Sequence, residues 1–307
     1  MHQQIPGLRS ECACVSESFG MSPRDIEVES DTFLGRGAGG MVTRAIHRPT
    51  GTLLAIKQVQ LCDKAKCDQL LNDIRTLIEG CQCEQLVKLH AAYLHQASGR
   101  VHLALEYMDM GSLHDMMKLT RAPFPERHMS VIVYQVVSAI KYLHELKLIH
   151  RDVKPGNILL NSDGCVKLSD FGISKTIDNT ANICDTFVGT ALYMSPERVF
   201  GKDYSFTSDI WSLGMVIFEM ATGGFPFPSM ASFPVLFDHL CNLPEPRLAV
   251  NSFSTDLCDI VTQCLQRDPS KRVSAIGLQS HPFVIAGGAE IGRIDFSAFL
   301  KHLISSK

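Results

Sequence analysis

The alternation of hydrophobic and polar positions predicts a sheet in the first part of the chain. From residue 25 to 61 apolar and polar residues alternate, a period of two that is typical of β-strands. The tetrapeptide Arg-Pro-Thr-Gly at 48–51 is a favourable hairpin turn, so this stretch predicts three antiparallel strands. Further strands are expected around 86–89 and 101–105.

The later part of the chain shows the period of a helix. A first helix is expected over 67–79, and a long core helix over 125–146. The stretch 207–223 is apolar almost throughout, as a buried central helix would be, and it opens with a cap signal at Thr207 or Ser208. Residues 257–265 predict another helix. In the tail, one helical face carries Ile294, Phe299, Leu300 and Leu303.

Composition and charge exclude several classes of protein. The formal net charge is -3 and the basic residues are scattered, so no nucleic-acid partner is expected. No apolar run reaches the length of a membrane span, and the polar N-terminus lacks a signal segment, which predicts no membrane insertion. The 11 cysteines are isolated or in Cys-x-Cys pairs, which is typical of free thiols in a reducing cytoplasm.

The run His-Arg-Asp-Val-Lys-Pro-Gly-Asn at 150–157, followed by Asp-Phe-Gly at 170–172, predicts a phosphotransfer centre. Asp152 can accept a proton from a substrate hydroxyl, and Lys154 can balance the charge on a moving phosphoryl group. Asn157 and Asp170 offer the hard oxygen ligands that magnesium prefers. Base and metal ligand lie on one tight loop, so both can reach the same point.

Three glycines between the first two predicted strands indicate a loop that covers phosphates. Gly35, Gly37 and Gly40 precede Val42 in the spacing GxGxxGxV. A lone GxGxxG also marks a dinucleotide-binding turn, but here a strand and a hairpin follow, where that turn requires a helix. Glycines let backbone amides approach ATP phosphates, and Lys57 on the third strand would reach the α- and β-phosphates.

The remaining parts of a nucleotide site follow in order. An acid on the helix at 67–79 should pair with Lys57, and Asp73 is best placed, next to the apolar stripe. Leu105 would close the back of the nucleotide pocket. The backbone at Glu106 to Met108 would bond the adenine edge.

Taken together, GxGxxGxV, Ala-Ile-Lys at 55–57, the two catalytic runs and Ser-Pro-Glu at 195–197 resemble the eukaryotic protein kinases over about residues 26–283. Lys154, two residues after the base, resembles the serine/threonine and dual-specificity branch. The resemblance implies an ion pair between Glu197 and Arg272, and support of the catalytic loop by Asp209. Further site residues that it implies are Leu34 and Ala55 at the nucleotide, and the structural residues His150, Arg151, Phe171, Gly172 and Thr190.

The same resemblance implies an α+β, bilobal kinase fold: a small antiparallel β-sheet lobe with one helix and a larger, mainly helical lobe. The expected divisions are a mobile arm at 1–24, the small lobe and hinge at 25–108, the large lobe at 109–284 and a C-terminal segment at 285–307.

A finer resemblance is to the mitogen-activated protein kinase (MAP kinase) kinases, through the stretches at 104–113, 185–201 and 208–227. In that family, two hydroxyl residues before Ser-Pro-Glu are phosphorylated by an upstream kinase. Thr180 and Thr186 are the candidates here, at a spacing similar to plant and protozoan members, and Arg151 could engage the phosphates. The alternative is that they are two ordinary loop threonines.

The resemblance therefore implies a dual-specificity kinase that uses ATP and Mg²⁺ and phosphorylates Thr and Tyr in the activation loop of a MAP kinase. The alternatives are another serine/threonine kinase of the same broad group, or a pseudokinase scaffold. Asp73 stands where the family has glutamate, and the arm lacks the family's basic docking cluster. The tail helix either docks the upstream kinase or packs on the large lobe.

Overall fold

The structure, a computed structural model, describes residues 21–37, 40–60, 70, 74, 78, 82–95, 98–120, 122–170, 192–227 and 233–305. Contacts divide the chain into two compact units, with the division between Asp109 and Met110. Antiparallel strands dominate the first unit and helices the second, which confirms the predicted α+β kinase fold.

A five-stranded antiparallel sheet in the order β1-β2-β3-β5-β4 forms the first unit. Its strands are β1 (Ile26–Gly37), β2 (Gly40–His47), β3 (Thr52–Val59), β4 (Leu89–His95) and β5 (Arg100–Glu106), preceded by the 3-10 turn η1 (Pro23–Asp25). The three strands predicted between 25 and 61 are confirmed as β1 to β3. At the predicted hairpin turn, the carbonyl of His47 accepts hydrogen bonds from the N–H groups of Thr50 and Gly51.

The strand predicted at 86–89 was misplaced, because β4 begins at Leu89 and ends at His95. Leu86 makes a single bridge, although its side chain is buried. The alternation that would reveal β4 is hidden because Ala91 and Ala92 are both fully buried. The sequence pattern therefore located the apolar residues but not the strand.

The two faces of this sheet have different surroundings. Ala45, Leu54, Ile56, Ala91 and Ala104 form a core cluster on one face. The opposite face carries Val42, Ala55, Lys57 and Leu105, because Val42 pairs with Lys57, Ala55 pairs with Leu105, and side chains alternate along a strand. In the helix predicted at 67–79, the three described residues are helical. Leu70 and Ile74 are buried as its apolar stripe requires, whereas Ile78, expected in the same stripe, is 37% exposed.

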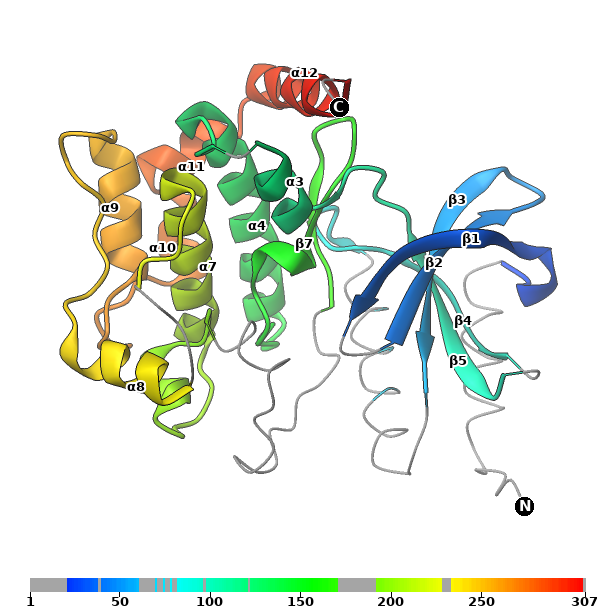
Figure 1. Ribbon diagram of the computed structural model, residues 1–307, viewed down its shortest axis with the longest axis horizontal. Coiled ribbons are helices and arrows are strands. Elements are labelled where there is room, and N and C mark those ends of the chain that lie inside the picture. Colours follow the sequence, from blue (N-terminus) through cyan, green and yellow to red (C-terminus); the bar gives the residue numbers. More distant parts are fainter. Residues whose placement is uncertain are drawn as a thin grey trace. The chain divides into compact units, whose positions relative to one another are not determined.

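The second unit is built around α4 (Glu126–Glu145). This helix packs against α7 (Phe206–Thr222), α10 (Ala275–Gln279), α11 (Pro282–Gly287), α12 (Glu290–Ser305) and β8 (Val166–Leu168). Pro125 is the N-cap of α4 and Leu146 the C-cap, so the predicted helix at 125–146 is confirmed. The stripe of Met129, Ile132, Val136, Ile140 and Leu143 is buried as expected. In Figure 1 the green α4 lies at the centre of this unit, beside α7.

The predicted central helix is α7 (Phe206–Thr222), but its cap was predicted wrongly. Ser205 is the N-cap, and Ser208 reaches back to accept a hydrogen bond from the N–H of Ser205. The helix ends at Gly223, whose φ of 72° is the left-handed conformation that glycine adopts at helix ends. Thr207 and Ser208 are the second and third residues of the helix, but Thr and Ser are also residue types that favour the N-cap position, which explains the error.

The other elements of the second unit are short. They are a small sheet of β6 (Gly111–Ser112), β7 (Ile158–Leu160) and β8 (Val166–Leu168), the 3-10 turn η3 (Pro155–Asn157), and the helices α3 (Leu113–Thr120), α6 (Pro196–Val199), α8 (Phe233–Asn242), α9 (Thr255–Cys264), α10 (Ala275–Gln279), α11 (Pro282–Gly287) and α12 (Glu290–Ser305). None of the helices in the described part of the chain has the length and apolar character needed to cross a bilayer.

The tail helix α12 packs on α4 through a face that differs from the predicted one. Phe296 and Leu300 are fully buried, whereas Ile294 is 57% exposed. Phe299 contacts the rings of Phe124 and His128. The predicted face was therefore wrong at Ile294, because several apolar residues occur around the helix and the sequence alone does not show which of them meet α4.

Candidate active site

The catalytic run lies in the second unit, in the loop between α4 and β7. Lys154 Nζ donates to both carboxylate oxygens of Asp152, at 2.8 and 3.0 Å. The side-chain amide of Asn157 donates to Asp152 Oδ2 at 2.9 Å and to the Asp152 carbonyl at 2.8 Å. The three side chains that the sequence assigned to proton transfer, charge balance and metal binding thus meet at one carboxylate.

Asn157 and Asp170 stand at the open end of the β7–β8 hairpin. Asn157 directly precedes β7, and Asp170 follows β8 by two residues. The carbonyl of Asn157 accepts hydrogen bonds from both the N–H and the hydroxyl of Ser169, at 2.8 and 3.1 Å. Antiparallel pairing thereby brings the two predicted metal ligands to the same end of one hairpin.

The donor set of these two residues fits a hard divalent cation. Both hydrogen bonds that the Asn157 side chain makes within the described part of the chain use its NH₂ group, which leaves the amide oxygen as the atom that can face a metal ion. Asp170 supplies a carboxylate from a backbone with φ of 58°, a left-handed conformation that aspartate tolerates better than most residues. Amide and carboxylate oxygens suit Mg²⁺.

His150 is a fully buried structural residue of the same loop. Its Nδ1 accepts from the N–H of Asp152 at 3.2 Å, and its Nε2 donates to the carbonyl of Ser169 at 3.0 Å. This pair of contacts requires the neutral ring with the proton on Nε2. Burial lowers the pKa of His150, which favours the same neutral form.

Asp209, on the buried α7, holds the start of the catalytic loop. Its Oδ2 accepts from the N–H of His150 at 2.9 Å and its Oδ1 from the N–H of Arg151 at 2.9 Å. His144, in the last turn of α4, contacts Oδ2 at 2.9 Å. A single buried carboxylate thus joins α4, α7 and the loop, as the resemblance implied for Asp209.

The first unit carries the residues predicted to meet the nucleotide. The glycine motif forms the hairpin end between β1 and β2, where Gly37 pairs with Gly40 and Gly35 with Val42. Gly40 has φ of 136°, and a Cβ there would overlap the carbonyl of Gln58, so a side chain is excluded. A strand follows the motif, which agrees with a phosphate-covering hairpin and not with a dinucleotide-binding turn.

Lys57 lies on β3, opposite Val42 of β2 and Leu103 of β5, and its side chain is buried. Because side chains alternate along a strand, Ala55 shares the face of Lys57, and Leu105 pairs with Ala55. Val42, Ala55, Lys57 and Leu105 therefore share one face of the sheet. Leu34, on β1, is 43% exposed.

The hinge follows β5 directly. The N–H of Glu106 donates to the carbonyl of Lys88 at 2.9 Å, and the Glu106 carboxylate accepts from the N–H of Lys88 at 3.3 Å. Met108 is buried. The Glu106 amide is thus already engaged within the protein, so an adenine ring would have to use other backbone groups of residues 106–108.

Several predicted residues lie outside the described part of the chain. They are Asp73, Phe171, Gly172, Thr180, Thr186 and Thr190, together with most of the predicted arm at 1–24. The pairing of Lys57 with Asp73 and both phosphorylation sites therefore stay predictions.

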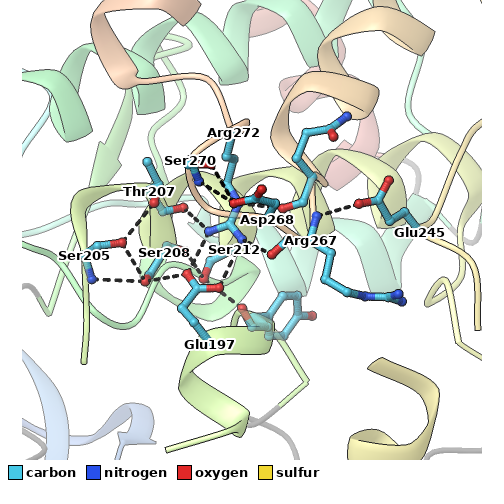
Figure 2. Close-up of polar contacts among 12 residues, drawn as sticks. Glu197, Ser205, Thr207, Ser208, Ser212, Glu245, Arg267, Asp268, Ser270 and Arg272 are labelled. Atoms are coloured by element: carbon cyan, nitrogen blue, oxygen red, sulfur yellow. Dashed lines mark hydrogen bonds and ion pairs between the residues drawn. The ribbon is translucent and has the colours of Figure 1, made fainter. Parts of the chain in front are cut away.

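A buried ion pair braces the second unit (Figure 2). Arg272 donates to both carboxylate oxygens of Glu197, at 2.8 and 3.0 Å, and also to the carbonyls of Thr207 and Gln266. Glu197 accepts a further bond from the Ser208 hydroxyl at 2.9 Å. Burial opposes the charge of Glu197, but the hydrogen bonds and the positive charge of Arg272, with further hydrogen bonds to the carboxylate, together lower the pKa of this carboxyl.

Two tyrosine contacts near the catalytic loop were not found from the sequence. The hydroxyl of Tyr204 donates to the carbonyl of Arg151 at 2.9 Å, and the guanidinium of Arg198 lies 3.5 Å from the centre of the Tyr204 ring. Tyr193 donates to Glu219 at 2.6 Å. The hydrogen-bonded partners are 53 and 26 residues apart in the sequence, so no local pattern signals these contacts.

Comparison with known proteins agrees with this geometry. The model of the protein kinase domain matches residues 28–284. Mitogen-activated protein kinase kinase 2 of Arabidopsis thaliana is 40% identical over 259 residues, which cover 82% of this chain and 70% of that protein. Mitogen-activated protein kinase kinase 5 of Leishmania mexicana is 36% identical over 277 residues, 86% of this chain and 51% of that protein.

A third relative is mitogen-activated protein kinase kinase 3 of Arabidopsis thaliana, which is 41% identical over 271 residues. The match covers 88% of this chain but 52% of the relative, so the chain spans about half the length of that protein. With the kinase-domain match and the grouping of Asp152, Lys154 and Asn157, these similarities show that the chain is an ATP-dependent protein kinase that belongs to the mitogen-activated protein kinase kinase family.

Proposed function

We propose that this kinase has dual specificity and transfers the γ-phosphate of ATP to both Thr and Tyr in the activation loop of a MAP kinase. The observation that carries the proposal is the set of hydrogen bonds from Lys154 and Asn157 to Asp152. The names of the Arabidopsis and Leishmania relatives state that those proteins are kinases of MAP kinases, which supports the same substrate class here.

In this proposal Asp152 orients the substrate hydroxyl and takes its proton. Lys154 donates to both carboxylate oxygens of Asp152, and Asn157 donates to Oδ2. Within the described residues Oδ1 therefore accepts fewer hydrogen bonds than Oδ2 and is the better placed acceptor. The Lys154 ammonium, 2.8 Å from Asp152, offsets negative charge on the phosphoryl group in flight. Proton acceptance and charge neutralisation thus come from one loop.

The metal and nucleotide roles are proposals on the same geometry. Asn157 and Asp170 would hold Mg²⁺, which neutralises charge on the phosphates when bound. Lys57 would contact the α- and β-phosphates, with the backbone of Gly35, Gly37 and Gly40 over them. Asp73 would orient Lys57. The adenine ring would lie against Leu34, Val42, Ala55 and Leu105 and bond to the backbone of residues 106–108.

Activation by an upstream MAP kinase kinase kinase at Thr180 and Thr186 is part of the proposal. Each phosphate would add about -1.5 to -2 charge and three strong acceptor oxygens. Arg151 has an exposed side chain next to Asp152, which supports its role as the cation that receives such a phosphate. The cytoplasmic location expected from the sequence, and the use of a scaffold, also stay predictions.

The test of dual specificity is transfer from magnesium ATP to a panel of catalytically inactive MAP kinases, with the phosphorylated residues mapped by mass spectrometry. Phosphate on both Thr and Tyr of one activation loop is the expected result. Labelling of Thr alone, or of proteins outside the panel, would assign the chain to another tier of serine/threonine kinases.

The test of the switch uses Thr180→Asp/Thr186→Asp together, compared with Thr180→Ala/Thr186→Ala. The aspartate form should transfer phosphate faster than the alanine form, because it mimics part of the added charge. Equal rates for the two forms after treatment with an upstream kinase would contradict activation at these threonines. Complete inactivity of every form would favour a scaffold.

A further inference from the structure

The β7–β8 hairpin has the two proposed metal ligands at one end and the tail helix α12 at the other. Its strands are three residues each, Ile158–Leu160 and Val166–Leu168. At roughly 3.3 Å per residue, the turn at 161–165 lies about 13 Å along the hairpin from Asn157 and about 16 Å along it from Asp170. A displacement of this turn would therefore be transmitted over a short, hydrogen-bonded segment.

The turn is internally well ordered. The side-chain oxygen of Asn161 accepts from the N–H groups of Asp163 and Cys165, at 3.1 and 2.9 Å. The N–H of Gly164 donates to the Asn161 carbonyl at 3.1 Å. Because these bonds hold the turn in one conformation, a force on the turn moves the whole hairpin and does not merely change the backbone of the turn.

On one side, α4 holds the turn through a buried glutamine. The amide of Gln135 donates to the carbonyl of Gly164 at 3.1 Å and accepts from the N–H of Val166 at 2.8 Å. Both hydrogen bonds involve backbone groups of the hairpin, so they fix the position of the turn, and of the first residue of β8, relative to α4.

On the other side, the turn lies directly against α12. The hydroxyl of Ser297 donates to the carbonyl of Ser162 at 2.6 Å. Gly164 has φ of 77°, and a Cβ there would lie 2.7 Å from the carbonyl oxygen of Arg293 and 3.3 Å from the N–H nitrogen of Ser297. In Figure 1 the red α12 is seen close to the green turn that follows β7.

The helix itself is fixed to α4. Asp295 pairs with Arg127 and with His128, each at 2.9 Å, and Phe296 and Leu300 are fully buried. The contact with the turn is thus made by an anchored helix and not by a loosely attached tail.

We propose that α12 acts as a buttress that holds the β7–β8 hairpin in the position required for metal binding, with Ser297 and Gly164 as positioning residues for Asn157 and Asp170. The proposal rests on the proposed magnesium role of those two residues. Loss of the Ser297 bond would let the hairpin shift away from α12, and a side chain at Gly164 would force the same shift, so either change would weaken the magnesium site.

The test titrates Mg²⁺ against binding of a fluorescent ADP analogue to the full chain. Ser297→Ala should raise the half-saturating Mg²⁺ concentration about 2- to 5-fold, and Gly164→Ala roughly 10-fold. Hydrogen exchange of the Ser169 amide, which bonds to the Asn157 carbonyl, should be faster in both variants.

Two matched controls separate this effect from general destabilisation. Ser305→Ala removes a hydroxyl of the same helix that bonds to Lys301. Gly99→Ala changes another hairpin-turn glycine of φ 65°, with no atom within 4 Å of the added Cβ. Neither should change the Mg²⁺ requirement.

A lower melting temperature without a changed Mg²⁺ requirement in Ser297→Ala would overturn the buttress role. Gly164→Ala also introduces backbone strain and could fail to fold for that reason. In that case the milder variant, Ser297→Ala, provides the test. Nucleotide binding by the unmodified protein that shows no dependence on Mg²⁺ would overturn the proposed magnesium role itself, and the buttress role with it.

Discussion

The carboxylate of Asp209 accepts a 2.9 Å hydrogen bond from the backbone N–H of Arg151, a residue whose φ is 69°. A left-handed backbone costs an arginine roughly 1–2 kcal/mol, so it persists because the surroundings enforce it. The second hydrogen bond, which Asp209 accepts from the N–H of His150, supplies that constraint. The strained residue lies immediately before Asp152, so the strain serves to aim the carboxylate that we propose as the catalytic base.

Replacement of Asp209 by Asn should therefore damage catalysis as well as stability. An amide has one acceptor oxygen, so one of the two N–H groups would face an NH₂ group. We expect a loss of about 2 kcal/mol in the free energy of unfolding and a lower kcat, with little change in KM for ATP. Denaturant unfolding and steady-state kinetics measure both, with the exposed Asp203→Asn as control; a normal kcat in Asp209→Asn would contradict the aiming role.

Removal of one charge from the ion pair of Glu197 and Arg272 should strongly reduce the stability of the protein. Arg272 has 0% and Glu197 6% side-chain exposure, so Glu197→Gln leaves a buried guanidinium without its counter-charge. A loss of about 3–5 kcal/mol in the free energy of unfolding is expected. Denaturant unfolding measures this loss.

The exposed pair of Arg48 and Glu27 provides the control, since its side chains are 64% and 51% exposed. Arg48→Gln should cost under about 1 kcal/mol. Similar losses for the two variants would show that burial does not govern the strength of the Glu197 pair.

The parts of this fold that follow one repeating pattern could be predicted from the sequence. The core helix α4 begins after Pro125 and ends before Leu146, as predicted. Its bounds could be predicted because its apolar residues recur regularly and a proline marks its start. The grouping of Asp152, Lys154 and Asn157 could be predicted as well, since they lie within one run, and the structure shows their side chains in contact; their catalytic roles stay predictions.

The features that depend on packing could not be predicted. The sequence does not show that Ile294 faces solvent while Phe296 is buried, because that depends on where α12 meets α4. The contact of His144 with Asp209 joins residues 65 positions apart, and no local pattern records it. The start of β4 was missed because two consecutive alanines are both buried and conceal the strand period.

His102 should make the protein less stable as the pH falls below about 6.5. It is buried on β5, and neither of its ring nitrogens has a hydrogen-bond partner among the residues that the structure describes. Its ring stacks on that of His95, with the ring centres 4.5 Å apart. Burial, and then the positive charge of His95 and Arg100, lower the pKa of His102 to about 4. Between these two pH values the unfolded chain binds a proton that the folded chain does not, so stability falls with pH across this window.

The variant His102→Phe keeps a ring at this position and removes the titration. Its free energy of unfolding should fall less than that of the unmodified protein between pH 6.5 and 4, by a difference of the order of 2–3 kcal/mol. Chemical denaturation across this range measures the difference. Parallel pH profiles for the two proteins would show that His102 is protonated equally in both states.

The most direct test of the proposed catalytic centre is single-turnover phosphate transfer from magnesium ATP to an inactive MAP kinase, with Asp152→Asn compared with the unmodified protein. Because Asp152 is assigned the substrate proton, the variant should transfer phosphate about 10²- to 10⁴-fold more slowly while its nucleotide affinity stays nearly unchanged. The exposed Asp163→Asn, on the nearby hairpin turn, should transfer at the normal rate. Transfer by Asp152→Asn at the unmodified rate would contradict the account.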